Sequence, residues 1–373
     1  MRIALLTRNF SRTAGGAESY AIAIAQALSQ RHEIHVFCQE TDHPVQLAHY
    51  HLVWRPCKRP RWVNQIYYAL STWWHTRTGF DRVHSHEHVF HGQVQTLHVQ
   101  PVSKGVSGNR RGWRWLWRWL GVLISPRRLT YLALEHARMR ATRGRQLVFA
   151  SPQLLNDFLP YYPHAANMAH VITPGVSVPQ TQGLRTEWRT QMGWKPDEVA
   201  LLFVANDYQR KGLDLVLQAL CILPPAFHLT VLGQTRQLSN YTERIEKMGL
   251  TSRVRFVGPR SDVGEWMAGA DTLVHPTLED SFGMVVLEAM AHGLPVVVSP
   301  APYCGLSAEL KHLEQAWVLD NPHEAQALAM AVERIQTDRP MRERLIEAGR
   351  REAMGRSWAE AALKYEKVFS LSL

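Results

Sequence analysis

Long apolar runs and cysteine motifs are both missing from this 373-residue sequence. No stretch approaches about 18 uninterrupted apolar residues, so we expect no membrane-spanning helix. The four cysteines are scattered without CxxC or metal-ligand spacing, which argues against a disulfide framework or zinc site and favours free thiols in a reducing compartment. The apolar start, Met1 to Thr7, is too short for a signal peptide and is predicted to be a buried strand.

Acidic residues are scarce in the first part of the chain. Residues 1–150 contain 21 Lys and Arg against 7 Asp and Glu, a net charge of +14. Residues 151–373 contain 21 against 25, a net charge of −4. This asymmetry predicts an anionic partner for the N-terminal half. Nucleic acid, acidic lipid and a phosphorylated acceptor all satisfy that requirement.

Two series of apolar strands alternate with helical patterns. In the first series, strands are expected near residues 2–7, 32–37, 82–86 and 94–98, with a helix over 17–30. A stretch rich in Pro, Gly and Gln follows, and the second series has strands near 200–204, 229–233, 254–258, 272–276 and 296–298. The pattern predicts an α/β protein with two Rossmann-like, doubly wound domains. Ligands should bind at the carboxyl ends of the strands, in a cleft between the domains.

One segment carries a long and specific pattern. Residues 275–297 read HPTLEDSFGMVVLEAMAHGLPVV, with two acidic residues separated by seven others, Phe-Gly after the first and Gly-x-Pro after the helical part. This segment resembles the donor-site signature of the family 4 retaining glycosyltransferases. The stretch from Arg210-Lys211-Gly212 to Asp271 is similar to the lipopolysaccharide-core glucosyltransferase branch of that family. The resemblance covers the C-terminal half well and the N-terminal half mainly through Gly15-Gly16.

The resemblance implies the GT-B fold, in which two Rossmann-like domains face each other across a cleft. We therefore expect an acceptor-binding domain over residues 1–173, a linker over 174–183 and a nucleotide-sugar-binding domain over 184–355. A C-terminal helix over 356–373 is expected to return to the first domain.

The same resemblance assigns roles around the acidic pair. Glu288 takes the position that binds ribose hydroxyls. The seven-residue gap selects Asp280, rather than Glu279, for the donor sugar, although most members have the longer Glu there. Gly283 allows the backbone to approach the ligand, and the first N–H groups of the following helix favour phosphate. The neighbouring donor-binding residues are Phe282 and Met284.

Basic residues complete the expected donor site. Lys211 and Arg210 follow a strand end, where cations can neutralise charge on a departing diphosphate, although an exposed Arg-Lys pair is more often a solvated turn. Gly15 and Gly16 open the first helix and could admit a diphosphate closely. Arg260 marks the turn where family members hold the nucleobase mostly through main-chain groups.

Histidines allow two interpretations. His84, His86, His88 and His91 cluster, but no acidic or cysteine partner stands at metal-ligand spacing, so we expect no metal site. His98 follows a strand and matches the family's active-site histidine near the reacting sugar carbon, so Asp280, Lys211 and His98 are the candidate catalytic residues. The alternative for His98 is an ordinary histidine at a strand end.

A basic, Trp-rich segment predicts a membrane contact. At helical spacing, its arginines form one stripe opposite a Trp and Leu face, as in helices that lie in the interface of an anionic bilayer. A core-packed helix with a solvated Arg edge is the alternative, and four Trp within seven residues make it less favourable because each buried indole N–H needs a partner. The predicted membrane-binding residues are Arg110, Arg111, Trp113, Arg114, Trp115, Trp117, Arg118 and Trp119.

Taken with the resemblance, these features predict a hexosyltransferase that retains anomeric configuration. The expected donor is a nucleotide sugar, first a UDP-sugar carrying glucose, and the expected acceptor is a membrane-associated glycolipid or oligosaccharide such as the lipopolysaccharide core. No metal or other cofactor and no nucleic-acid partner are expected, and the predicted location is the cytoplasmic face of a membrane, held peripherally. Two alternatives stay open: a GT-B nucleotide-sugar epimerase, and a catalytically silent relative that binds membranes or polyanions.

Overall fold

The computed structural model describes residues 1–12, 15–107, 125–177, 185–233 and 238–372. It divides into two compact units, one made of Met1–Pro174 with Trp358–Leu373 and one made of Gly175–Ser357. The predicted domain limits at residues 173 and 356 lie beside these boundaries. Most of the predicted linker, from residue 178 onward, lies outside the described residues.

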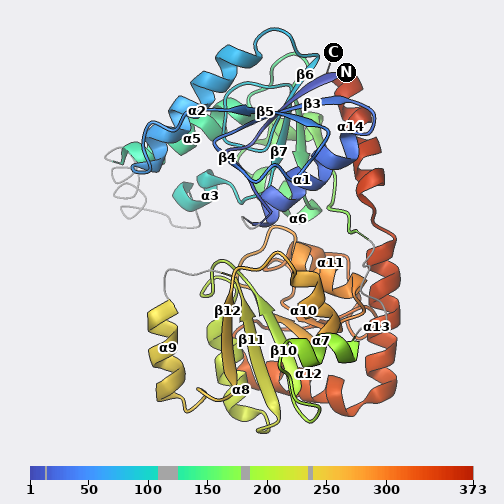
Figure 1. Ribbon diagram of the computed structural model, residues 1–373. Helices are drawn as coiled ribbons and strands as arrows, with labels where there is room; N and C mark the ends of the chain where they lie inside the picture. Colours follow the sequence, from blue (N-terminus) through green and yellow to red (C-terminus); the bar gives the residue numbers. More distant parts are fainter. Residues whose placement is uncertain (13–14, 108–124, 178–184, 234–237, 373) are drawn as a thin grey trace. The chain divides into compact units, whose positions relative to one another are not determined.

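The N-terminal unit is built on a seven-stranded parallel sheet (Figure 1). Strand β1 (Arg2–Leu6), which pairs with the central strand, is apolar and buried from Ile3 onward, as expected for a parallel strand covered on both faces. The chain reaches one half of the sheet after β1 and the other half from β6 onward, so the ends of β1 and β6 flank a topological switch point. In spatial order the strands are β5 (Ala48–Leu52), β3 (Glu33–Cys38), β1 (Arg2–Leu6), β6 (Arg82–Ser85), β7 (Val94–Leu97), β8 (Gln146–Phe149) and β9 (Ala169–Val171).

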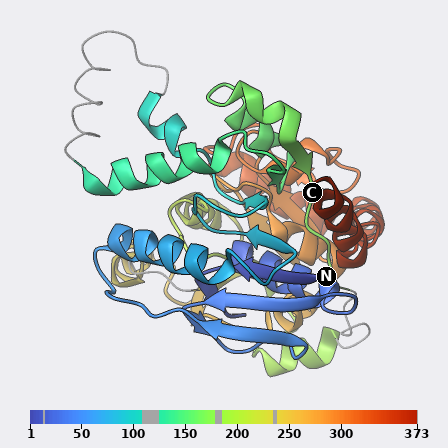
Figure 2. The same cartoon turned by 90° about the horizontal axis from the view of Figure 1, so that it is seen from above.

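Helices from both ends of the chain belong to this unit. The last helix packs on the first, and their tyrosine hydroxyls, Tyr20 and Tyr365, lie 3.0 Å apart. Seen from above, α2 runs beside the strands and next to α5 (Figure 2). The helices are α1 (Gly16–Leu28), α2 (Arg61–Thr76), α3 (Val102–Ser107), α5 (Pro126–Met139), α6 (Pro152–Phe158), the 3-10 turn η1 (Pro163–Met168) and α14 (Trp358–Leu371); the short strands β2 (Asn9–Phe10) and β4 (Glu40–Thr41) pair separately.

The C-terminal unit repeats the same plan with six parallel strands. Taken in chain order, its strands are arranged 3-2-1-4-5-6, the order of dinucleotide-binding Rossmann folds, and the switch point lies between β10 and β13. Both units therefore have the predicted doubly wound α/β architecture. In spatial order the strands are β12 (Val254–Gly258), β11 (Phe227–Leu232), β10 (Val199–Val204), β13 (Thr272–His275), β14 (Val296–Val298) and β15 (Trp317–Val318).

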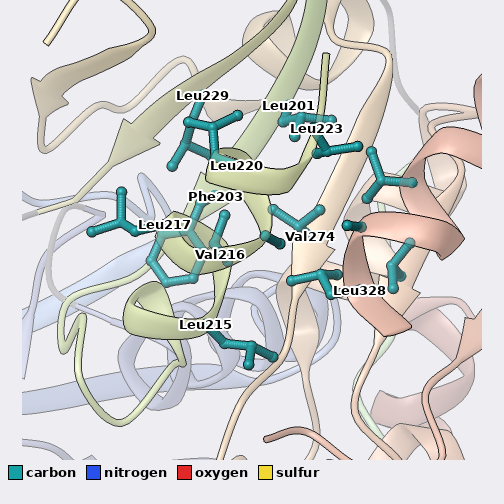
Figure 3. Close-up of a cluster of buried hydrophobic side chains, with 14 of the residues drawn as sticks. Leu201, Phe203, Leu215, Val216, Leu217, Leu220, Leu223, Leu229, Val274 and Leu328 are labelled. Carbon is teal, nitrogen blue, oxygen red and sulfur yellow. The ribbon is translucent and has the colours of Figure 1, made fainter. Parts of the chain in front are cut away.

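Two apolar clusters cover the two faces of this second sheet. Along β10, Leu201 and Phe203 enter one cluster, whereas Ala200 and Leu202 enter the other, as the two-residue period of a strand requires. Figure 3 shows the first cluster, in which α8 and α12 pack against the strands. The helices are α7 (Arg185–Gln191), α8 (Leu213–Ile222), α9 (Leu238–Lys247), α10 (Val263–Gly269), α11 (Met284–Ala291), the 3-10 turn η2 (Gly305–Ala308), α12 (Ala325–Thr337) and α13 (Arg339–Met354).

None of the described helices combines the length and the apolar character needed to cross a bilayer.

Candidate functional site

Three polar side chains meet at the switch point of the C-terminal sheet. Lys211 Nζ lies 2.5 Å from Asp280 Oδ2 and donates a second hydrogen bond to the Glu279 carbonyl at 3.1 Å. His275, the last residue of β13, places its Nε2 3.0 Å from the same Asp280 oxygen. The structure therefore brings together two of the predicted catalytic residues, 69 positions apart in the chain.

Two glycines with left-handed backbone hold the loops of this cluster in place. Gly212 has φ +84°, and a Cβ there would lie 2.0 Å from the Pro276 carbonyl oxygen, so only glycine allows the two loops to touch. Gly283 has φ +100° and caps α11 directly before Met284. Phe282, which is buried, donates its backbone N–H to Asp280 Oδ1 at 3.3 Å. The loop thus supplies a main-chain partner for the carboxylate.

Asp280 is ionised in this environment. Burial raises the pKa of its carboxyl, but the His275 hydrogen bond and the Lys211 charge outweigh burial and hold the pKa well below its ordinary value. His275 is buried, and burial lowers the pKa of its ring, although the Asp280 hydrogen bond opposes this change. The imidazole therefore serves as a neutral hydrogen-bond partner that orients the carboxylate.

Glu288 differs from Asp280 in both partners and charge. It lies in the second turn of α11 and is half-buried, and its carboxylate forms no hydrogen bond or ion pair with any described residue. Burial raises the pKa of Glu288 from its ordinary value of 4.5 to about 7. An unpartnered carboxylate at the strand-end edge of the sheet is available to accept hydrogen bonds from ligand hydroxyls.

The two arginines predicted for the donor site form ion pairs at the surface. Arg210 Nε lies 3.5 Å from Asp207, and its Nη1 lies 3.7 Å from Glu279. Arg260 pairs with Asp262 two residues later. Exposed pairs of this kind contribute about 0–1 kcal/mol, so a phosphate could displace either of them easily.

The predicted histidine lies in the N-terminal unit, at the end of β7. His98 Nε2 is 2.8 Å from His86 Nδ1, their rings are stacked, and the edge of the Tyr20 ring meets His98 at a centroid distance of 4.9 Å. Burial, with a smaller contribution from the Arg138 charge, lowers the pKa of His98 to about 3. His98 is thus a neutral ring held by aromatic neighbours.

A buried polar chain supports this histidine pair. His84 Nε2 lies 2.8 Å from the Thr96 hydroxyl, which lies 2.8 Å from Tyr365 of α14. The Tyr365 hydroxyl also lies 3.0 Å from the Tyr20 hydroxyl, and either of the two can be the donor. The Tyr20 hydroxyl lies 3.0 Å from the Ile172 carbonyl oxygen, to which it can donate. Nothing in the spacing of the sequence indicated that the C-terminal helix completes this network.

Arg138 and Glu135 of α5 are further polar residues that the sequence interpretation missed. Arg138 is buried, donates to Gln95 at 3.1 Å, and also donates to the Thr96 carbonyl. Glu135 is buried and accepts from the backbone N–H and the hydroxyl of Ser103 at 3.0 and 2.7 Å. The available signal was their i, i+3 spacing, which places both on one face of a helix.

The remaining predicted residues are described in part. Gly15 is the N-cap of α1 and Gly16 its first residue, as expected for a glycine-opened helix. The membrane-binding segment, Arg110 to Trp119, lies outside the described residues.

The described histidines also include one group with metal-ligand proximity. The ligand atoms of Glu33, His35 and His49, on β3 and β5, lie within 4.8 Å of one another. Arg2, whose Nη2 lies 3.5 Å from His35, places a positive charge beside this group and disfavours a cation. The predicted cluster differs: His84 and His86 lie with ring centroids 4.4 Å apart, and burial lowers the pKa of both rings.

Comparison with known proteins covers nearly the whole chain. The profile described as Glycosyltransferase Family 4 matches residues 14–179, and the profile described as Glycosyl transferases group 1 matches residues 185–352. The chain belongs to the family 4 glycosyltransferases. The predicted family resemblance and the GT-B fold class are thereby confirmed.

The curated relatives share less than a third of their residues with this chain in the aligned parts. The lipopolysaccharide glucosyltransferase WaaG of Escherichia coli K12 is 29% identical over 65% of this chain, and the D-inositol 3-phosphate glycosyltransferase of Corynebacterium diphtheriae is 29% identical over 60%. The aligned parts span 63% and 55% of the lengths of these two relatives, less than two thirds of each.

Solved structures agree on the fold. The crystal structure of WaaG, a glycosyltransferase involved in lipopolysaccharide biosynthesis, superposes with a TM-score of 0.85, 24% identity and 99% coverage of both chains. Anabaena Alr3699/HepE, solved in complex with UDP-glucose, gives a TM-score of 0.77 at 18% identity and 99% coverage of both chains. At identities of 24% and 18%, the similarity to these two structures establishes the fold of this chain.

Proposed function

We propose that this family 4 glycosyltransferase is a retaining enzyme that moves a hexose, with glucose the first candidate, from a UDP-sugar to a membrane-associated glycolipid such as the lipopolysaccharide core. The observation that carries the proposal is the cluster of Lys211, Asp280 and His275 at the Rossmann switch point, with the unpartnered Glu288 on the adjoining helix. Ligands of doubly wound sheets bind at this position.

Each member of the cluster has a role in the proposed transfer. Glu288 accepts hydrogen bonds from the ribose hydroxyls, and the ionised Asp280 accepts from the hydroxyls of the donor sugar. Lys211 and Arg210 stabilise the charge that develops on the leaving diphosphate. The N–H groups at the start of α11 add a favourable dipole for the same charge. Catalysis then rests on positioning and leaving-group stabilisation, without a metal.

The basic N-terminal unit supports the choice of acceptor. A cavity of about 620 Å³ is lined by Arg127 and Arg128 at the start of α5, together with Tyr131, Val102 and Ser125. Two arginines beside an aromatic ring suit a phosphorylated sugar. The proposed location is the cytoplasmic face of a membrane whose anionic surface attracts this unit. His98 remains a predicted contact of the reacting sugar.

A thermal-shift panel of UDP-, GDP- and ADP-sugars, followed by a transfer assay, tests the proposal. We expect stabilisation by UDP-glucose above the other nucleotide sugars and, with a heptose-containing core acceptor, a product that keeps the α configuration of the donor. Conversion of the donor without an acceptor would identify an epimerase instead. No shift with any nucleotide sugar would identify a catalytically silent relative, and either result would end the proposal.

A further inference from the structure

Helix α2 has its polar and apolar faces reversed relative to an ordinary surface helix. Its buried side chains include Asn64, Gln65, Thr72 and Thr76, which face the protein. The exposed side chains include four large apolar residues at i, i+4, i+7 and i+8 spacing, which form one stripe: Ile66, Leu70, Trp73 and Trp74. We call these four residues the α2 stripe.

The buried polar residues of α2 form hydrogen bonds inside the protein. Asn64 exchanges hydrogen bonds with Gln39 at 2.8 and 2.9 Å, and Gln65 donates to the His88 carbonyl at 2.8 Å. Thr72 donates to the Tyr68 carbonyl within the helix at 2.7 Å. Because these bonds fix which face of α2 is inside, rotation of the helix cannot bury the α2 stripe. The apolar side chains of the α2 stripe therefore stay exposed on the surface.

The exposed apolar surface continues from the α2 stripe onto the chain after β5. Trp54 is 67% exposed, and its ring meets the ring of Tyr67 of α2 at a centroid distance of 5.4 Å. Leu52, at the end of β5, is 69% exposed. Large apolar patches of this kind on a protein surface mark interaction sites rather than chance exposure.

The segment that carries this patch contains charges of one sign. Residues 43–80 contain five Lys and Arg and no Asp or Glu. Lys58, Arg59, Arg61 and Arg77 are exposed, and none of the four forms a salt bridge within the described part of the chain. The guanidinium of Arg77 lies 3.6 Å from the centroid of the Trp74 ring. Cations thus border the α2 stripe at both ends of the helix, with Trp rings between them.

We propose that the α2 stripe, with Trp54 and the cations at both ends of α2, is a docking surface for an anionic lipid bilayer. Trp side chains favour the headgroup region, where the ring is shielded and the indole N–H stays hydrated. Lys and Arg beside them bind acidic headgroups, each contributing about 1 kcal/mol near such a surface. This inference deepens the proposed function and rests on it, because it supplies a face that meets the membrane carrying the acceptor.

Vesicle flotation of the full chain tests the surface. We expect the wild-type protein to float with vesicles of phosphatidylethanolamine containing about 30% phosphatidylglycerol, and much less with phosphatidylcholine vesicles. The variant Leu70→Ser/Trp73→Ser/Trp74→Ser should reduce the partition coefficient by roughly tenfold or more, since each side chain loses an apolar contact with the bilayer. The charge variant Lys58→Glu/Arg59→Glu should bind the anionic vesicles more weakly than the wild type does. The difference should be largest at low salt, where charges are screened least.

A matched control removes as many exposed apolar side chains elsewhere. Ile222→Ser/Met330→Ser/Leu363→Ser changes residues that are 47%, 56% and 45% exposed on other helices, and it should float like the wild type. Unfolding temperatures of all variants, with and without UDP, identify any variant that fails to fold.

Several outcomes would contradict the proposed docking of the α2 stripe on a bilayer. Wild-type flotation by the folded Leu70→Ser/Trp73→Ser/Trp74→Ser variant would do so, as would equal binding of the wild type to phosphatidylcholine vesicles. A lipid-free dimer that the same variant dissociates would show that a second copy covers the stripe instead. If the variant loses flotation but still transfers sugar to a short, water-soluble acceptor, the result supports the proposed docking surface. Flotation needs no turnover, so failure of the proposed transfer reaction would be seen separately.

Discussion

The ionisation of Glu288 predicts a measurable pH dependence of stability. Its pKa is about 7 in the folded protein and 4.5 in the ordinary, solvated state, because burial disfavours the charge. Between these values the folded protein holds a proton that the unfolded chain has lost. Stability from this group is therefore fully present below pH 4.5 and is lost as the pH rises through about 7.

The size of the effect follows from the same two values. At about 1.4 kcal/mol for each pKa unit, the difference corresponds to about 3 kcal/mol of stability lost by pH 8, and to less where solvent reaches the carboxylate. Glu288→Gln keeps the shape of the side chain and removes the charge. We therefore expect the variant to be more stable than the wild type by about 2–3 kcal/mol at pH 8 and nearly equal to it at about pH 4.

Denaturant unfolding of both proteins at a series of pH values measures this difference directly. Glu246→Gln is the matched control, because Glu246 lies exposed on α9 of the same unit and should show no such trend. A stability difference between Glu288→Gln and wild type that stays constant with pH would refute the reasoning. In the proposed function UDP binds the ionised carboxylate, so calorimetry near pH 6.5 should detect release of part of a proton from the wild type and none from the variant.

Four other substitutions test the remaining parts of the site. Lys211→Ala should cost about 2–4 kcal/mol in denaturant unfolding at neutral pH, since it leaves a buried carboxylate without its cation, and should abolish transfer; wild-type turnover would contradict this. Gly212→Ala should lower the unfolding free energy by about 2 kcal/mol or more, because its Cβ would lie 2.0 Å from the Pro276 carbonyl oxygen. His98→Gln should reduce turnover by roughly a hundredfold while the UDP thermal shift persists, and loss of that shift would contradict the predicted contact. Arg210→Ala should raise KM for the donor without changing stability by more than about 1 kcal/mol, and a large loss of stability would show that its exposed ion pairs are structural.

Local patterns account for the part of the molecule that the sequence predicts well. Both sheets consist of apolar strands that alternate with helices, and such periodicity is independent of distant contacts. The loop before α11 is also encoded locally, because Phe282-Gly283 and the spacing of Asp280 and Glu288 lie within nine residues. Helix α11 begins directly after this glycine, at Met284, as the helical part of the signature predicts.

Long-range partners account for the part that could not be predicted. Lys211 meets Asp280 across 69 residues because β13, which ends at His275, lies beside β10. Tyr365 reaches Thr96 across 269 residues. A sequence shows that such residues are polar, but not which of them share a sheet edge. The reversed faces of α2 were hidden for the same reason, since the partners of its buried amides lie on other segments.

The charges at the switch point constrain how a diphosphate is accommodated there. Lys211 is held at 2.5 Å by an ionised Asp280, so the pair is close to neutral and contributes little attraction at long range. Arg210 is held only by exposed carboxylates at 3.5 and 3.7 Å and can be released at small cost. In the proposed reaction, Arg210 and the α11 N-terminus therefore provide the initial attraction for the donor. Lys211 remains in place, where its charge becomes effective as negative charge develops on the leaving group and Asp280 turns to the sugar hydroxyls.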